Sequence, residues 1–325
     1  MILIACATAG LLSFATVALL LRSGAARVAL DLPNERSLHA SPTPRIGGLG
    51  IMAGALPVLA MSGLPPVLPA VAALLAALSF VDDRRGLPVA LRFGAHLLAA
   101  AALAGLWPAP WPGVMAAGAV MLGTVWMTNL YNFMDGSDGL AGGMAVCGFG
   151  ACGLAARLAG DASLAAACLG LAGAAAGFLW FNRHPARVFM GDAGSIPLGF
   201  LAAAIGVAGW QRGAWPVWFQ PVVFGPFVAD ATVTLLRRAW RGERVWQAHR
   251  SHYYQRLVQL GFGHARTARV EYALMLASAA VALAAVRASS LAAISLLALL
   301  AGAYVLAARW IDRRWDCLRP AGSHP

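Results

Sequence analysis

A polar stretch within an otherwise apolar chain carries two carboxylates three positions apart. Asp135 and Asp138 are two of only 13 acidic residues, and a glycine follows each of them. Asn129 and Asn132 precede them at the end of an apolar run. Charge beside lipid is costly, so acids gathered at the end of a membrane helix usually bind or react with something. These residues favour a site for a charged substrate, with an ordinary polar turn as the alternative.

A second pair of acids, Asp82 and Asp83, ends another apolar run. Adjacent carboxylates repel each other, so a neighbouring cation or a shared proton is expected. The pair therefore suits a general base or part of a Mg²⁺ site. The alternative is a solvated helix end in which the acids pair with Arg84 and Arg85.

A further acid, Asp192, lies between two glycines at the start of an apolar run. Gly191 and Gly194 would let the backbone approach a ligand closely. We expect Ser195 to cap the helix that follows, whose free N–H groups would attract a phosphate. An acid at such a site is favourable when a divalent ion bridges it to the anion, and Mg²⁺ is commonly held by one or two carboxylates plus substrate phosphates. A simple helix cap is the alternative.

Basic side chains and histidines supply further candidate contacts for phosphate. Arg45 stands in a loop rich in Pro, Ser and Gly, and His249, Arg250 and His252 stand in a long basic loop. His249 and His252 would share a helical face because they are three residues apart. A pyrophosphate or a sugar is one ligand for this loop. Anionic lipid is the alternative, and zinc is disfavoured because no third ligand is evident.

Two polar residues lie inside apolar runs. Asp230 is a functional candidate because an acid within a membrane segment is costly, and pairing with Arg238 is its structural alternative. His96 is interpreted as a hydrogen-bonded residue of the helix bundle.

The composition is that of an integral membrane protein. The 325 residues are 60% hydrophobic and 11% charged, with a mean hydropathy of +0.71, whereas a soluble domain carries about 25% charged residues. The net charge is +11, and every basic residue is arginine. These arginines flank apolar runs without a basic and aromatic groove pattern, so membrane orientation explains them and nucleic acid is not an expected partner.

The sequence predicts an all-α, polytopic membrane protein with about 11 transmembrane helices. One domain would cover 1–325, with the motifs between 36 and 257, and with two further helices and a cytoplasmic tail in 258–325. The apolar runs long enough to span a bilayer are 2–21, 46–63, 65–81, 89–107, 113–131, 139–158, 162–182, 195–210, 215–236, 270–286 and 290–308.

The arginine distribution predicts the orientation. Of the 24 basic residues, 21 lie in odd-numbered connections, within a few residues of one, or in the tail, and the other three are Arg157, Arg212 and Arg287. Because positive loops stay in the cytoplasm, the N-terminus would be outside and the C-terminus inside the bacterial inner membrane. All the polar motifs then fall at the cytoplasmic face, whereas a transporter would place its polar site near the midplane. An enzyme at that face is therefore favoured over a lipid or solute transporter.

These motifs occur together, in the same order, in one family. The chain resembles the polyprenyl-phosphate N-acetylhexosamine-1-phosphate transferases of glycosyltransferase family 4, which transfer a sugar 1-phosphate from a UDP-sugar to a lipid phosphate and release UMP. The match runs from Arg36 to Leu257. Its motifs are Pro42-Thr-Pro-Arg-Ile-Gly-Gly, Asp82-Asp83, Asn132-Phe-Met-Asp-Gly-Ser-Asp-Gly-Leu-Ala, Phe189-Met-Gly-Asp-Ala-Gly-Ser, Pro226 to Asp230 with Arg237-Arg238, and the His249 loop.

The resemblance implies roles for the matched residues. Asp192, assisted by Asp83, would ligate Mg²⁺, with Mn²⁺ as a substitute, and Asp82 and Asp83 would activate the lipid phosphate. Asp135 would act with them in catalysis. The remaining residues would contact the substrate: Asp138, Asn182 and Phe189 the uracil, Asn132 and Asp135 the nucleotide and diphosphate, Arg45 a phosphate, and His249, Arg250 and His252 the diphosphate or sugar.

The expected reaction joins an N-acetylhexosamine 1-phosphate from a UDP-sugar to undecaprenyl phosphate, as the first step of O-antigen or other cell-envelope glycan assembly. The His-Arg-Ser-His form at 249–252 looks more like this branch than like the triple-His run of the muropeptide-transferring branch. A phospho-N-acetylmuramoyl-pentapeptide transferase is the alternative. A phosphotransferase that uses a CDP-lipid is disfavoured, because Leu140-Ala-Gly-Gly stands where its signature needs Ala-Arg. Membrane lipid is an expected partner, and a homodimer is left open.

The predicted orientation can be tested by labelling single cysteines in a Cys-free variant. Gly63→Cys and Gly113→Cys should react with an impermeant thiol reagent in intact cells, while Ser251→Cys should not, because the basic loop would be cytoplasmic. Labelling of position 251 from outside would reverse the orientation.

Overall fold

The computed structural model describes residues 2–24, 29–32, 41–107, 110–245, 247 and 249–318. Arg36 and the other motif residues before 41 lie outside this part of the chain. The described residues are mostly helical, as predicted, with one two-stranded antiparallel pairing of β1 (Leu30–Asp31) and β2 (Thr43–Pro44).

Most helices are joined by short connections. In chain order they are α1 (Ile2–Arg22), α2 (Gly47–Met61), α3 (Val67–Arg85), α4 (Val89–Gly105), α5 (Val114–Phe133), α6 (Leu140–Leu158), α7 (Ala162–Asn182), α8 (Asp192–Gln211), α9 (Phe219–Val223), α10 (Gly225–Trp240), α11 (Tyr253–Leu257), the π-helical turn η2 (Val258–Phe262), α12 (Gly263–Arg287) and α13 (Ser290–Leu318). The longer connections lie between α1 and α2 and between α10 and α11.

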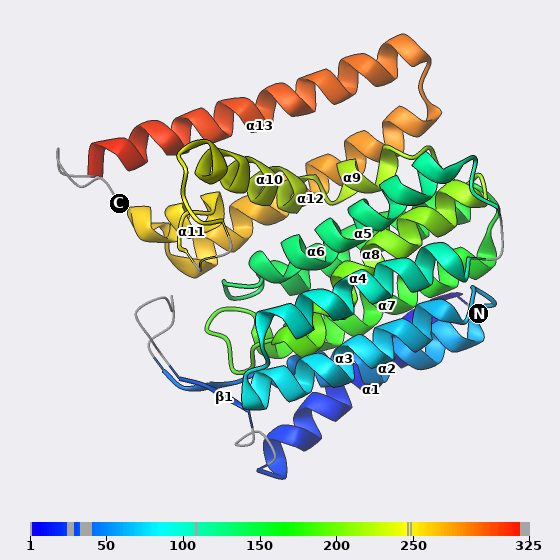
Figure 1. Ribbon diagram of the computed structural model, residues 1–325, viewed down its shortest axis with the longest axis horizontal. Helices are drawn as coiled ribbons and strands as arrows, with labels where there is room; N and C mark the ends of the chain where they lie inside the picture. Colours follow the sequence, from blue (N-terminus) through cyan, green and yellow to red (C-terminus); the bar gives the residue numbers. More distant parts are fainter. Residues whose placement is uncertain are drawn as a thin grey trace.

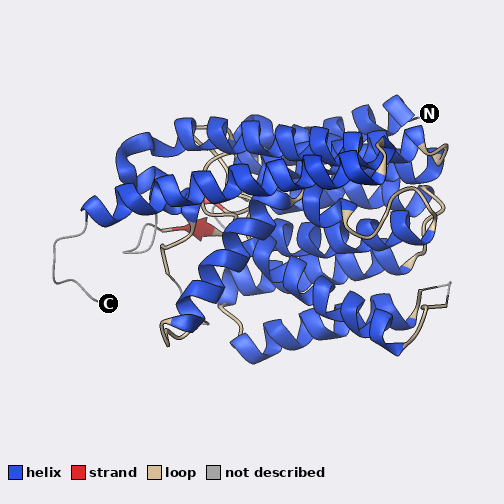
Figure 2. Ribbon diagram, turned by 90° about the horizontal axis from the view of Figure 1, so that it is seen from above, coloured by secondary structure: helices blue, strands red, loops and turns tan. Residues whose placement is uncertain are grey.

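The long helices form one bundle (Figures 1 and 2). α7 packs against α1, α2 and α6, and α8 packs against α3 and α5. α13 lies along the outer edge of the bundle, where it packs against α11 and α12 (Figure 1). Because the helices alternate in direction, the connections that carry the sequence motifs meet at one end of the bundle.

The expected membrane spans coincide with helices. Within the described residues, seven helices are long and apolar enough to cross a membrane: α1, α5, α6, α7, α8, the α11 to α12 segment, and α13. The other expected spans correspond to α2, α3, α4, and α9 with α10, which are shorter or carry more charge. The chain is a multi-pass membrane protein, and the count of about 11 spans stays a prediction.

One expected span is broken in two. The run predicted at 215–236 contains α9 and α10, separated at Phe224. Pro226 stands in the first turn of α10, where its missing N–H costs nothing, whereas within a continuous helix the proline would remove a hydrogen bond. The local sequence therefore starts a new helix at Gly225.

His96 lies where the sequence predicts. Its side chain on α4 is buried, and its Nδ1 is 3.2 Å from Oδ1 of Asn129 on α5. The interpretation as a hydrogen-bonded bundle residue is confirmed.

Glycines bring the backbones of α1 and α7 into direct contact. A Cβ on Gly173 would lie 2.1 Å from the carbonyl oxygen of Cys6, and one on Gly177 would lie 2.2 Å from that of Gly10. Small residues at helix crossings are typical of membrane bundles, in which close backbone approach supplies much of the packing energy.

A methyl group at Gly173 should therefore destabilise the bundle. Gly173→Ala should cost about 1–3 kcal/mol, the usual penalty of overpacking, and should lower the thermal unfolding midpoint in detergent. Gly150→Ala on α6 is the control, because a Cβ there meets nothing within 4 Å. Equal midpoints for the two variants would contradict this account.

Candidate active site

Two distant loops pair where the bundle ends. The Phe189 N–H donates to the Pro44 carbonyl oxygen at 2.8 Å, and the Phe189 carbonyl oxygen accepts from the Gly47 N–H at 3.0 Å. One step further, the Gly48 N–H donates to the Met190 carbonyl oxygen at 2.8 Å. The loop before α8 is thus fixed to the loop before α2, and Phe189 is half-buried within this pairing.

The carboxylate of Asp83 lies against the start of α8. Its Oδ2 accepts from the Ala193 N–H at 3.2 Å, and its Oδ1 is 3.9 Å from the Arg45 guanidinium. A Cβ on Gly191 would lie 2.8 Å from Asp83 Oδ2, and the φ of Gly191 is +70°, so the position requires glycine. Asp83 lies beyond the apolar run 65–81, and burial, followed by repulsion from Asp192, raises its pKa to about 7.

Asp82 points elsewhere. Its Oδ2 is 3.1 Å from the Arg92 guanidinium of α4, and its Oδ1 accepts from the Leu87 N–H at 2.5 Å. The same guanidinium lies 3.9 Å from Oδ2 of Asp192. Among the described residues, neither Asp82 nor its neighbour Asp83 pairs with the two arginines that follow them in sequence. Arg92 was missed in the sequence because it falls inside an expected span.

The turn between α5 and α6 brings a third acid to this cluster. Asp135 is partly buried, and its pKa is raised by burial and then by repulsion from Asp192 and Asp83. Asn132 lies one turn earlier, where its Oδ1 accepts from the Ser195 hydroxyl at 2.7 Å. Asp83, Asp135 and Asp192 therefore form one acidic cluster, drawn from α3, the α5–α6 turn and α8.

The expected cap of α8 is wrong. α8 begins at Asp192 with Gly191 as its N-cap residue, and no side chain caps it. Ser195 lies inside the helix, and its hydroxyl also donates to the Gly191 carbonyl oxygen at 3.2 Å. The left-handed conformation of Gly191 starts the helix three residues earlier than the sequence predicts.

The other predicted acid of the α5–α6 turn, Asp138, faces the loop between α7 and α8. Its Oδ2 lies 2.7 Å from Nδ1 of His184 and accepts from the Ala186 N–H at 3.1 Å. His184 stacks on His264, with 5.7 Å between ring centroids. His184 was not among the residues predicted from the sequence, although its place in a polar connection, two residues after Asn182, is a signal that could have identified it.

Asn182 is buried, and both ends of its amide are used. Its Oδ1 accepts from the Gly139 N–H at 3.0 Å, and its Nδ2 donates to the Val188 carbonyl oxygen at 2.9 Å. Asn182 therefore joins the Asp138 turn to the loop that carries Phe189. Uracil contacts for these residues stay predictions.

Asp230 organises the histidine loop. Its Oδ1 accepts from the Tyr253 N–H at 2.9 Å and lies 3.1 Å from Nδ1 of His252, while its Oδ2 accepts from the Tyr254 N–H at 3.0 Å. An acid at the first turn of a helix satisfies free N–H groups and complements the helix dipole. The alternative pairing of Asp230 with Arg238 is wrong.

Arg238 instead binds Glu243 at 2.8 Å, within the connection after α10. That acid lies five residues away in the sequence, close enough for the two side chains to meet as α10 ends. Arg237, the other member of the pair, binds Asp312 of α13 at 2.6 Å.

The histidine loop contacts the turn that carries Asp135. His252 stacks on Phe133 with 6.3 Å between ring centroids, and the Tyr254 hydroxyl donates to the Phe133 carbonyl oxygen at 3.1 Å. A Cβ on Gly136 would lie 2.2 Å from the Tyr254 hydroxyl, so glycine makes room for this contact. The acidic cluster and the histidine loop thus flank one turn.

His249 and Arg250 lie at the outer side of this loop. The His249 ring lies tilted against that of His252, with 4.8 Å between ring centroids, and its Nδ1 is 2.8 Å from the Ser251 hydroxyl. Arg250 is exposed, whereas His252 is only 3% exposed. Of the three predicted residues, His249 and Arg250 are therefore better placed to reach a substrate than His252.

Comparison with known proteins gives a consistent result. A family model for glycosyl transferase family 4 matches residues 66–209. The chain is 32% identical over 294 residues to the decaprenyl-phosphate N-acetylglucosaminephosphotransferase of Mycobacterium tuberculosis, across 75% of this chain and 72% of that protein. It is 30% identical to the undecaprenyl-phosphate alpha-N-acetylglucosaminyl 1-phosphate transferase of Yersinia pestis, across 78% and 74%. It is 31% identical to the phospho-N-acetylmuramoyl-pentapeptide-transferase of Thermosynechococcus vestitus, across 70% and 67%.

These matches, with the helical bundle and the motifs in order, define the class: a multi-pass membrane transferase of the polyprenyl-phosphate sugar-1-phosphate type. The chain belongs to glycosyl transferase family 4, as its motifs indicate.

Asp230→Asn should loosen the histidine loop, because each hydrogen bond to a charged acceptor is worth about 1.5–3 kcal/mol. Trypsin should then cut after Arg256, which is buried, about ten-fold faster or more, since the opened state is what the protease cleaves. Mass spectrometry of timed digests measures this. Asp161→Asn, which removes a capping acid from the start of α7, should leave cleavage after Arg256 unchanged. Equal rates of cleavage after Arg256 in the two variants would contradict the role of Asp230 in ordering the histidine loop.

Proposed function

We propose that this protein transfers an N-acetylhexosamine 1-phosphate from a UDP-sugar to undecaprenyl phosphate at the cytoplasmic face of a bacterial inner membrane. The observation that carries the proposal is the acidic cluster of Asp83, Asp135 and Asp192, with the guanidinium groups of Arg45 and Arg92 beside it. Acids and arginines gathered around a helix start suit a diphosphate and its counter-ion. The relatives, named for transfer to decaprenyl or undecaprenyl phosphate, support the same reaction.

The cluster fits a divalent ion. Its acids come from three separate segments. Burial raises the pKa of Asp83 and of Asp135, and repulsion from Asp192 raises both further, so the cluster favours an added positive charge. Among the described residues, no three His, Cys, Asp or Glu side chains are close enough to hold a metal by themselves. Mg²⁺ is typically held by one or two carboxylates, with substrate phosphates supplying further oxygens. When held by Asp192 and the substrate phosphates, Mg²⁺ would supply charge that neutralises the donor diphosphate and improves UMP as a leaving group, and the neighbouring Asp83 would stay uncoordinated.

The side chains at this end of the bundle have separate roles in the reaction. Arg45 and Arg92 hold the phosphates in line, and Asp83, with its pKa of about 7, accepts a proton from the acceptor phosphate. An oxygen of the acceptor phosphate then bonds to the β-phosphorus. The bond from that phosphorus to the bridging oxygen breaks, and UMP departs with the electron pair. Phosphoryl transfer needs such positioning and charge neutralisation more than covalent help.

The acceptor chain has a matching surface. An apolar groove of about 420 Å³ runs along α5, α8, α9 and α10, lined by residues such as Val120, Met127, Val207 and Val228. α5 also carries Asn132 at its end, beside the acidic cluster. A prenyl chain in this groove would bring its phosphate to the cluster from the membrane side.

The donor and the pathway follow from the histidine loop. His249 and Arg250 lie at its outer side, and the His-Arg-Ser-His form favours a single amino sugar and O-antigen or another envelope glycan. The muramoyl-pentapeptide donor is the second candidate, because the relative from Thermosynechococcus vestitus carries that name.

A donor panel tests the function. Detergent-solubilised protein would receive undecaprenyl phosphate, Mg²⁺ and in turn UDP-N-acetylglucosamine, UDP-N-acetylgalactosamine and UDP-N-acetylmuramoyl-pentapeptide, with UMP release as the measurement. We expect release with one of the first two donors. Release only with the third would establish the second candidate, and release that does not require the lipid phosphate would refute transfer to it.

Asp192→Asn should lower UMP release about 100-fold or more, since losing about 3 kcal/mol of transition-state stabilisation has that effect. The change keeps the side-chain shape and removes the anion, so the protein should still elute as a folded species. Wild-type activity should vanish with EDTA and return with Mg²⁺ or Mn²⁺. Arg313→Gln, on exposed α13, is the control and should retain activity. Full activity of Asp192→Asn, or of the wild type in EDTA, contradicts the assignment.

A further inference from the structure

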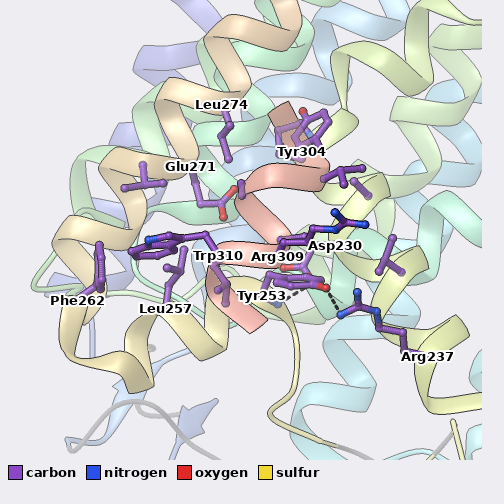
Figure 3. Close-up of a pocket in the computed structure, with 18 residues that line it drawn as sticks. Asp230, Arg237, Tyr253, Leu257, Phe262, Glu271, Leu274, Tyr304, Arg309 and Trp310 are labelled. Atoms are coloured by element: carbon purple, nitrogen blue, oxygen red, sulfur yellow. Dashed lines mark hydrogen bonds between the residues drawn. The ribbon is translucent and has the colours of Figure 1, made fainter. Parts of the chain in front are cut away.

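A second cavity lies away from the acidic cluster, between α10, α12 and α13 (Figure 3). Its volume is about 650 Å³, and most of its lining is apolar, including Leu257, Phe262, Val270 and Leu274. α12 and α13 are both long and apolar enough to cross a membrane, so the occupant of a cavity between them comes from the bilayer.

The cavity contains a buried acid, Glu271. Glu271 of α12 is 6% exposed, and within the described part of the chain it makes no hydrogen bond or ion pair. Figure 3 shows its carboxylate directed from α12 into the cavity. A buried carboxylate left unpaired is costly, because it loses its hydration without compensation. A ligand that brings a hydrogen-bond donor or a cation would remove that cost.

The other charged groups of the cavity wall are already engaged, with one exception. Asp230 is held by the start of α11, and Arg237 binds Asp312. Arg309 of α13 lines the cavity, is exposed, and forms no ion pair with any described residue. An acid on α12 and a guanidinium on α13 are therefore both available to one ligand.

We propose that this cavity binds one phosphatidylethanolamine molecule, whose ammonium group contacts Glu271, whose phosphate contacts Arg309 and whose acyl chains cover the apolar wall. A primary ammonium donates hydrogen bonds to a carboxylate, whereas the quaternary ammonium of phosphatidylcholine has none to give. An anionic lipid such as phosphatidylglycerol would satisfy Arg309 but would offer Glu271 only neutral hydroxyl donors, which bind a carboxylate more weakly than an ammonium does. A prenyl phosphate would add an anion beside two acids, so charge complementarity favours the zwitterion.

The bound lipid fills a gap in the bundle. α13 has no buried residue in its most apolar stretch, and near its end Asp312 contacts Arg237 and Arg256. A lipid held between α10, α12 and α13 would link the outermost helix to the rest of the bundle. It would also cover the side of α10 from which Asp230 reaches the histidine loop.

Native mass spectrometry of delipidated protein tests the proposal. Phosphatidylethanolamine, phosphatidylcholine and phosphatidylglycerol with identical chains would each be titrated in detergent. We expect one phosphatidylethanolamine to bind about ten-fold more tightly than either other lipid, as one charge-assisted hydrogen bond implies. Glu271→Gln should abolish this preference. The readout is lipid binding rather than UMP release, so its failure is distinct from failure of the transferase function.

The exposed arginines of α13 supply a matched pair of variants. Arg309→Gln should weaken binding of phosphatidylethanolamine, whereas Arg313→Gln, which does not line the cavity, should leave it unchanged. This pair decides the question even if Glu271→Gln fails to fold. Equal retention of the three lipids by the wild type, equal effects of the two arginine variants, or stronger binding of undecaprenyl phosphate that survives Glu271→Gln would each overturn the proposal.

Discussion

The burial of several acids close together at the end of an apolar bundle is the constraint on which the site depends. Asp83, Asp135 and Asp192 come from separate segments, and burial, followed by repulsion from Asp192, raises the pKa of both Asp83 and Asp135. Such a cluster persists only if the surrounding backbone holds it in place. The pairing of the loops before α2 and α8 and the cross-link through Asn182 provide that support. A cationic or metal-bound ligand would relieve this repulsion, so its binding would be favoured without any rearrangement of the acids.

A second level of organisation joins the acids to the histidine loop through polar contacts to the backbone. Asp230 fixes the start of α11, Tyr254 reaches the turn after α5, and Gly136 leaves the space for it. The histidine loop is therefore held by Asp230, which accepts hydrogen bonds from its backbone, and by Tyr254, which bonds to the turn after α5. Because the loop is already ordered, substrate groups can be positioned without the entropy cost of ordering the protein on binding.

The sequence predicted the helices and the acids well, because both depend on local information. Runs of apolar residues predict helices at nearly all the expected places, and charge in such a chain is rare enough to mark a site. Partners were harder to predict. Arg92 meets Asp82 only because α4 folds back beside α3, and Asp230 caps α11 across 22 residues of chain. The start of α8 was misplaced because the positive φ of Gly191 sets it, and a positive φ cannot be read from the pattern of apolar residues in the sequence.

The contact between α1 and α7 bears on how the protein is made. The backbone of α1 reaches a helix that leaves the ribosome only after five others have been synthesised. Until then, the face of α1 that carries Cys6 and Gly10 can meet only lipid or other nascent helices. Its final partner is selected by shape, since Gly173 and Gly177 let the backbone of α7 reach the carbonyl oxygens of Cys6 and Gly10. The first helix is therefore enclosed late, only when α7 enters the bilayer and packs against it.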